Sequence, residues 1–197
     1  MAKKSTRDMI IGVAARLFGT VGLRKTTMET IAAAAGRGRR TVYMYFSNKA
    51  EIYEAVVEGE LDRIIRPLRE IAASEEPFGP VLKNYAVKRI MLLKDLGNRN
   101  PLLLKDFAQG MSRVEKLKER LLREEEKVIT PFFYRHRKEL NLPSGATVED
   151  CAAIFINILR GTDKMLAQEN GHEKNTRISL AGADLFIKGL WQGSAGE

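Results

Sequence analysis

Apolar residues recur at helical spacing along the 197-residue chain. In the first predicted helix, about 6–21, they fall at i, i+3, i+4, i+7, i+8 and i+11 and so form one face. The same spacing predicts further helices over about 27–35, 39–46, 49–73, 80–96, 100–109, 112–129, 147–170 and 176–191. No alternation of the kind that is typical of β-strands appears. We therefore predict an all-α fold of about nine helices.

Residues that start or stop helices divide this pattern. Thr26 and Thr27 can both cap the second helix, and Gly36 breaks it before the third. Pro67 lies inside the fourth predicted helix, where it predicts a bend or a break. Gly97 is expected to close the fifth helix. The stretch from Thr26 to Lys49 therefore consists of two short helices joined by a glycine turn.

Charge is distributed very unevenly between the two ends of the chain. The formal net charge is +8. Residues 1–50 hold ten Lys and Arg residues but only two acids, Asp8 and Glu29, while the rest of the chain holds equal numbers of basic and acidic residues. The whole excess therefore lies in the first quarter. A basic head on a neutral body is typical of a protein that binds a polyanion.

The basic residues of the head gather at the start of the third predicted helix. Arg37, Arg39 and Arg40 lie there, followed by the aromatic residues Tyr43 and Tyr45. Arginine can bond bidentately to guanine edges in the major groove of DNA. The pattern indicates a unit that places one helix against nucleic acid. A phosphate-binding loop is disfavoured, because GRGR lacks the required spacing and follows no strand.

The stretch from Ile10 to Val56 resembles the TetR family of bacterial transcription regulators. The matching segments are AARLFGTVGLRKTTMETIAAAAG and TVYMYFSNKAEIY, about a quarter of the chain. The resemblance implies an N-terminal three-helix DNA-binding domain over 1–49, with the helix-turn-helix at about 27–46. It also implies a C-terminal helical domain over 50–197 for effector binding and dimerisation. The expected partners are double-stranded DNA with a palindromic operator, a small-molecule effector and a second copy of the chain.

The resemblance and the charge pattern together assign candidate site residues. DNA contacts are predicted for Thr27, Met28, Arg37, Gly38, Arg39, Arg40, Thr41, Tyr43, Tyr45 and Lys49. Arg39 and Arg40 are expected to read bases, and Thr27, Thr41, Tyr43 and Lys49 are expected to contact the DNA backbone. Arg37 and Gly38 depart from the family pattern, which has an apolar residue and then a capping residue at these positions. The third helix is therefore expected to start within one or two residues of Arg39.

The body offers two further groups of candidates. Aromatic, methionine and histidine side chains of its helices are candidates for an effector pocket: Tyr85, Phe107, Met111, Phe133, Tyr134, His136, Phe155 and Met165. The late helices carry more apolar surface than one small body can bury, which indicates a homodimer seam. Its predicted residues are Phe155, Ile158, Leu159, Leu185, Leu190 and Trp191.

Other classes of function have little support in the sequence. The only histidines are His136 and His172, and Cys151 is the only cysteine, so no cluster has metal-ligand spacing and no cofactor is expected. No apolar run is long enough to cross a membrane, and we expect a cytoplasmic protein. The leading hypothesis is a ligand-responsive dimeric repressor. The alternatives are a TetR-like protein controlled by a protein partner and an all-α enzyme with a basic head.

Overall fold

The computed structural model describes residues 5–102, 112–161, 163 and 172–190, and every regular element among them is a helix. These elements are α1 (Thr6–Thr20), α2 (Met28–Ala34), α3 (Arg39–Tyr45), α4 (Lys49–Ala72), α5 (Phe78–Arg99), α7 (Ser112–Arg135), the 3₁₀ helix η1 (Arg137–Glu139), α8 (Val148–Arg160) and α10 (His172–Leu190). The prediction of an all-α fold is confirmed, with no strand in the described ranges.

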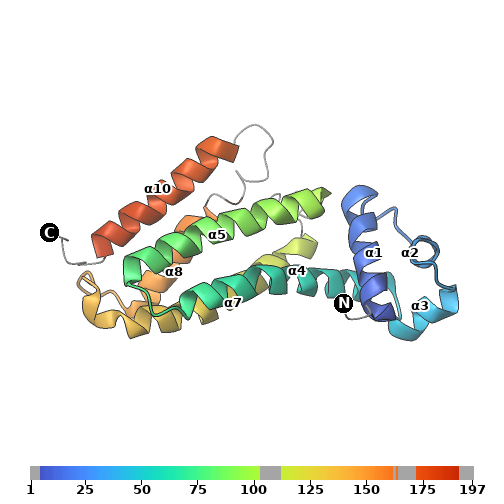
Figure 1. Ribbon diagram of the computed structural model, residues 1–197, viewed down its shortest axis with the longest axis horizontal. Coiled ribbons are helices and arrows are strands. Elements are labelled where there is room, and N and C mark those ends of the chain that lie inside the picture. The colour runs from blue at the N-terminus through green and yellow to red at the C-terminus, as the bar shows by residue number, and fades with distance from the viewer. Residues whose placement is uncertain (1–4, 103–111, 162, 164–171, 191–197) are drawn as a thin grey trace.

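The helices form an elongated molecule with two parts (Figure 1). The head consists of α1, α2, α3 and the first turns of α4, and it occupies one end. The body consists of the remainder of α4 together with α5, α7, α8 and α10, which lie lengthwise against one another. Helix α4 runs out of the head and along the body, where it packs against both α5 and α7. It is therefore the main element shared by the two parts.

Each part has its own hydrophobic cluster, and α4 contributes to both. Ile52, Ala55 and Val56 belong to the head cluster, whereas Val57 and Leu61 belong to the body cluster. Pro67 lies inside α4 without ending it. The helix is therefore continuous from the head into the body, and the alternative of a break at this proline is wrong.

Four helix boundaries differ from the prediction by three or more residues. Helix α7 continues through Pro131 to Arg135, six residues past its predicted end. Gly97 does not close α5, which continues to Arg99 with Asn100 as its C-cap. Helix α8 ends at Arg160, ten residues before the predicted limit, because Gly161 caps it with bonds to the carbonyls of Asn157 and Leu159. Helix α10 begins at His172 instead of near residue 176. Glycine and proline are weak stop signals wherever tertiary packing supports one more turn.

Head and body also meet where α1 ends. A Cβ placed on Gly19 would lie 2.7 Å from the side-chain oxygen of Asn100 and 3.3 Å from the carbonyl oxygen of Arg99. The carboxylate of Glu60, on α4, accepts hydrogen bonds from Arg99 at 2.8 Å and from Asn100 at 3.3 Å. Glu60 and Asn100 are both buried. The junction is thus a polar contact that the absence of a side chain at Gly19 makes possible.

Candidate nucleic-acid interface

Helix α3 is fixed to the head by its apolar side. Val42 is fully buried, and Phe46, the C-cap of α3, is 3% exposed. Both belong to the head cluster with Ile10 of α1 and Ile31 of α2. The turn before α3 depends on Gly36, whose φ of 60° lies in the left-handed region that glycine tolerates. The opposite side of α3 is left facing solvent.

The start of α2 is set by Thr27. Its hydroxyl accepts a hydrogen bond from the Thr30 amide, and the Thr30 hydroxyl accepts one from the Thr27 amide, so the pair forms a capping box. Glu29, the acidic residue in the first turn of α2, is ion-paired with Arg39 at 2.8 Å. Its pKa is lowered by a backbone hydrogen bond, then by the Thr27 hydroxyl and the charge of Arg39. Thr27 is exposed and Thr26 is buried.

The exposed side of α3 is basic and aromatic. Arg39, Arg40, Tyr43 and Tyr45 are exposed, and so are Arg37 and Gly38 just before the helix. Gly38 is the N-cap residue and supplies no side-chain cap, so α3 begins at Arg39 as the sequence indicated. Thr41 is half-buried at the edge of this surface. The structure therefore brings these predicted DNA-contact residues together on one face of the head.

The arginines of this surface are not equivalent. Arg39 is ion-paired with Glu29 at 2.8 Å, and its guanidinium lies 5.9 Å from the centre of the Tyr43 ring. Within the described part of the chain, Arg37 and Arg40 have no ion-pair or hydrogen-bond partner. Arg39 is thus held across α2 and α3, while Arg37 and Arg40 carry the uncompensated charge of the surface.

Two predicted contact residues point into the protein. Met28 is 7% exposed and belongs to the head cluster, which makes it a core residue instead of a surface contact. Lys49 is half-buried, and its ammonium group donates hydrogen bonds to the carbonyl oxygens of Leu23 and Thr26, both at 2.7 Å. Lys49 therefore fastens the start of α4 to the loop between α1 and α2.

This geometry predicts a structural effect of Lys49. Lys49→Ala should lower the free energy of unfolding by about 1–2 kcal/mol, because two hydrogen bonds from a charged group are lost. Chemical denaturation measures this, with Lys25→Ala as a control, since Lys25 is an exposed lysine of the same region. The salt dependence of DNA binding should stay close to wild type. Unchanged stability together with a flattened salt dependence would instead mark Lys49 as a phosphate contact.

Sequence reasoning missed one prominent residue of α3. Met44 is 77% exposed, the largest exposed fraction among the large apolar side chains that are exposed in the described residues. A signal existed, because Met44 follows Val42 by two positions and so faces away from the core side of the helix. An apolar side chain on this face can contact thymine methyl groups.

Of the predicted effector residues that the structure describes, three lie in the packed core of the body. Tyr85, Phe133 and Phe155 are fully buried in an aromatic core together with Phe78 and Phe132. The rings of Tyr85 and Phe155 have centroids 6.0 Å apart, and those of Phe133 and Phe155 are 6.2 Å apart. Three of the predicted residues lie outside the described residues, namely Phe107, Met111 and Met165.

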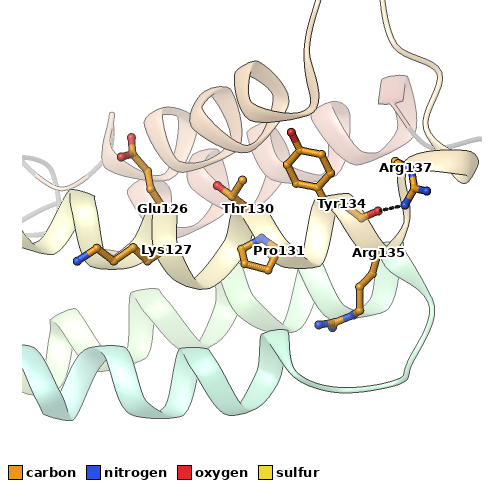
Figure 2. Close-up of a pocket in the computed structure, with 7 residues that line it drawn as sticks. All are labelled: Glu126, Lys127, Thr130, Pro131, Tyr134, Arg135 and Arg137. Carbon is orange, nitrogen blue, oxygen red and sulfur yellow. Dashed lines mark hydrogen bonds between the residues drawn. The ribbon is translucent and has the colours of Figure 1, made fainter.

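Tyr134 and His136 lie near the surface at the end of α7. The Tyr134 hydroxyl binds the Glu149 carboxylate, and the His136 Nδ1 lies 2.8 Å from the Glu139 carboxylate. Figure 2 shows that Tyr134 borders a hollow whose lining comes entirely from α7 and η1. One helix and the turn after it do not enclose a ligand. Of the predicted effector residues, the lining of this hollow contains Tyr134 alone.

A buried ion cluster in the body was not predicted. Arg89 of α5 bonds the Glu125 carboxylate at 2.6 and 3.3 Å and the Asp163 carboxylate at 2.7 and 3.0 Å. Arg89 is 1% exposed and Glu125 is fully buried. Burial raises the pKa of Glu125, and the charge of Arg89 acts in the opposite direction. The sequence did contain a signal for the burial of Arg89, because Arg89 follows Leu82 and Tyr85 on the inner face of α5.

Tyr85 lies next to this cluster. Its hydroxyl is buried and has no hydrogen-bond partner among the described residues. Burial raises the pKa of Tyr85 well above its usual value, and the negative charge of Glu125 adds to the effect. Of the predicted effector residues that the structure describes, Tyr85 is the one with an unsatisfied buried polar atom.

The predicted dimer residues separate into two groups. Phe155, Leu159 and Leu190 are buried within the chain. Ile158 is half-buried and packs against Gly182, where an added Cβ would lie 3.1 Å from an Ile158 methyl group. Leu185 is 73% exposed, and Ile154 and Ile178 are exposed beside it on α8 and α10. Trp191 lies outside the described residues.

Two further searches cover only the described part of the chain. No group of three or more His, Cys, Asp or Glu side chains within it could hold a metal ion. No helix within it combines the length and the apolar character that a bilayer crossing requires.

Comparison with known proteins identifies the head. Residues 10–56 match the model of the family described as bacterial regulatory proteins, tetR family. The transcriptional repressor KstR2 of Rhodococcus jostii is 38% identical over 72 residues, which are 36% of this chain and 35% of KstR2. The transcriptional regulator TtgR of Pseudomonas putida is 35% identical over 78 residues, or 40% of this chain and 37% of TtgR. The matches thus span little more than a third of these curated relatives.

Solved structures share the fold over almost the entire chain. A transcriptional regulator from Cytophaga hutchinsonii superposes with a TM-score of 0.74 and 24% identity, covering 94% of this chain and 98% of its own. SmeT, the repressor of the Stenotrophomonas maltophilia multidrug efflux pump SmeDEF, has a TM-score of 0.72 and 20% identity, covering 98% and 94%. At these identities the likeness concerns the fold alone. The match to the tetR family of bacterial regulatory proteins therefore concerns residues 10–56, the head of the chain, on a fold that solved transcriptional regulators share over almost the entire chain.

Proposed function

We infer that the protein is a transcriptional regulator that binds double-stranded DNA with α3 in the major groove. The observation that carries this inference is the exposed face of α3, where Arg37 and Arg40 have no partner among the described residues and Tyr43 and Tyr45 are exposed. Residues 1–50, which include this face, hold the entire excess charge of the chain. The family match over residues 10–56 supports the same reading.

The contacts of α3 suggest separate roles for its residues. Arg40 has no competing partner in the described chain, so we assign it to base reading. Arg39 is already paired with Glu29 and stacked near Tyr43, so its charge is shared with the protein. Thr41, Tyr43 and the exposed Thr27 are suited to phosphate contacts, which position the helix without reading sequence. Lys49 supports the head from within.

The active form in this proposal is a homodimer joined through α8 and α10. Ile154, Ile178 and Leu185 form an exposed apolar surface next to the Ile158–Gly182 contact between these helices. A twofold pairing of this surface would bury these side chains and build a four-helix bundle. Two heads related by a twofold axis match a palindromic operator whose half-sites lie about one helical turn apart.

Repression relieved by a small molecule is the proposed mode of control. KstR2 and SmeT are both named as repressors. The buried Tyr85 hydroxyl, which has no hydrogen-bond partner among the described residues, supports an effector site in that part of the chain. Control by a protein partner is the alternative. A calorimetric titration with candidate small molecules in the presence of operator DNA separates the two.

DNA binding is tested by selection from a random duplex library, followed by fluorescence anisotropy. The wild-type protein should enrich a palindrome and bind it as two chains per duplex in light scattering. Arg40→Ala should weaken binding to that palindrome by roughly tenfold, and weaken binding to unrelated duplex less, because a base contact is removed. Arg66→Ala is the matched control, since Arg66 is an exposed arginine on α4 in the body. Absence of any enriched sequence would refute the proposed function.

A further inference from the structure

A groove of about 680 Å³ lies between α5 and α10 in the body. Its apolar lining comes from small and aliphatic side chains: Ala86, Val87, Leu180, Ala181 and Ala183. The two helices run antiparallel (Figure 1). The lining residues extend from Lys83 to Lys94 on α5 and from Thr176 to Asp184 on α10. Its volume and its apolar floor suit an extended hydrocarbon chain.

The polar residues of the groove are mostly cationic. Three of its charged lining residues are basic, Lys83, Lys94 and Arg177, and Asp184 is the single acid. Asp184 is fully engaged, because it accepts hydrogen bonds from Lys83 at 2.8 Å and from Lys188 at 2.7 Å. Asp184 therefore forms an ion-pair cluster with Lys83 and Lys188 at one end of the groove. It does not compensate the positive charges of Lys94 and Arg177.

The opposite end of the groove carries the available charge. Lys94 is half-buried, Arg177 is exposed, and neither has a carboxylate partner among the described residues. Lys83 and Lys94 are eleven residues apart on α5, so the groove extends about 16 Å along the helix. An apolar floor that ends in two cations without a carboxylate partner in the described chain matches a ligand with an apolar body and one terminal anion.

We propose that this groove binds an amphipathic monocarboxylate, with its aliphatic body along the Ala86–Val87 side and its carboxylate between Lys94 and Arg177. A second copy of the chain fits less well, because a twofold contact here would face lysine and arginine with lysine and arginine. The exposed apolar surface of Ile154 and Leu185 lacks this conflict. Any effect of the ligand on DNA rests on the proposed function, whereas binding itself does not.

The test is calorimetric titration of the full-length protein with decanoate, with 1-decanol as the uncharged analogue. Decanoate should bind and decanol should bind much more weakly. The double variant Lys94→Gln/Arg177→Gln should weaken decanoate binding by roughly fivefold or more, because two charge-assisted contacts are lost at a partly exposed site. Lys88→Gln is the matched control, since Lys88 is a half-buried lysine of α5 that does not line the groove.

A second variant tests the groove without removing a cation. Val87 is 41% exposed, so Val87→Glu should leave the fold intact and repel the carboxylate. Circular dichroism and light scattering verify that both variants are folded and keep the wild-type association state. Equal binding of decanol and decanoate, or unchanged affinity in the double variant, would overturn the proposal. So would dissociation of a dimer by Val87→Glu. Failure of DNA binding alone would leave the decanoate result intact and would affect only the proposed function.

Discussion

Arg89→Met should lower the free energy of unfolding by about 3–5 kcal/mol at neutral pH, because it leaves two carboxylates in the interior without their counter-ion. Arg89 is the sole basic partner that the described structure gives Glu125 and Asp163 within hydrogen-bond distance. Glu125 is fully buried, so water does not replace the lost contact. Chemical denaturation at pH 7.5 measures the loss.

The pH dependence of this variant follows from the carboxylates. Burial already raises the folded-state pKa of Glu125 in the native protein, and Arg89 opposes that rise. Without Arg89 the rise is larger. A carboxyl whose folded pKa exceeds its unfolded value favours folding at low pH and loses that contribution as the pH rises through the folded pKa. The deficit of Arg89→Met should therefore shrink as the pH falls from 7.5 toward 5.

Removing the whole cluster provides the control. The triple variant Arg89→Met/Glu125→Leu/Asp163→Leu should recover most of the lost stability, because no buried charge remains unpaired. If the triple variant is less stable than Arg89→Met, the loss comes from packing and not from uncompensated charge.

Gly19→Val should destabilise the protein by about 1–3 kcal/mol, because it overpacks the contact between head and body. The new Cβ alone would lie 2.7 Å from the Asn100 side-chain oxygen and 3.3 Å from two backbone atoms, the Arg99 oxygen and the Asn100 Cα. Asn100 has little freedom to move, since it is buried and bonded to Glu60. Thermal and chemical denaturation measure the effect.

The same helix offers a matched control at Gly12. A Cβ there meets no atom within 4 Å, so Gly12→Val should change the stability by less than about 0.5 kcal/mol. Similar losses for Gly12→Val and Gly19→Val would show that helix propensity, and not the junction, decides the outcome. The double variant Gly19→Val/Asn100→Ala should recover part of the loss, because the closest clash is with the Asn100 side chain.

The helical pattern and the head were largely predictable from the sequence. Local signals are strong there, because the Ile10–Phe18 stripe, the Thr27 cap and the Gly36 turn each follow from residues a few positions apart. The exposed face of α3 follows from the same reasoning, since Val42 and Phe46 fix its inner side. Charge counting then located the basic surface without any knowledge of the fold.

The remaining features depend on residues distant in sequence. Lys49 donates hydrogen bonds to the carbonyls of Leu23 and Thr26, which lie 26 and 23 positions earlier in the chain. No local pattern distinguishes such a lysine from a solvent-exposed one. Arg89 meets partners 36 and 74 residues away. The effector candidates were chosen by residue type, and type alone does not separate core aromatic residues from the lining of a cavity. The groove between α5 and α10 likewise requires the pairing of two helices that are far apart in the chain.

Because α4 is continuous through Pro67, a small tilt of this helix in the body moves the head by a larger distance. The span from Lys49 to Pro67 acts as a rod about 27 Å long, at 1.5 Å per residue. A tilt of about 5° at its body end would therefore carry the head through about 2 Å, more than half of the roughly 3.4 Å between stacked base pairs. In the twofold assembly proposed above, the displacements of the two heads add. A rearrangement too small to disturb the body's core would then move the two α3 helices out of register with a fixed pair of half-sites.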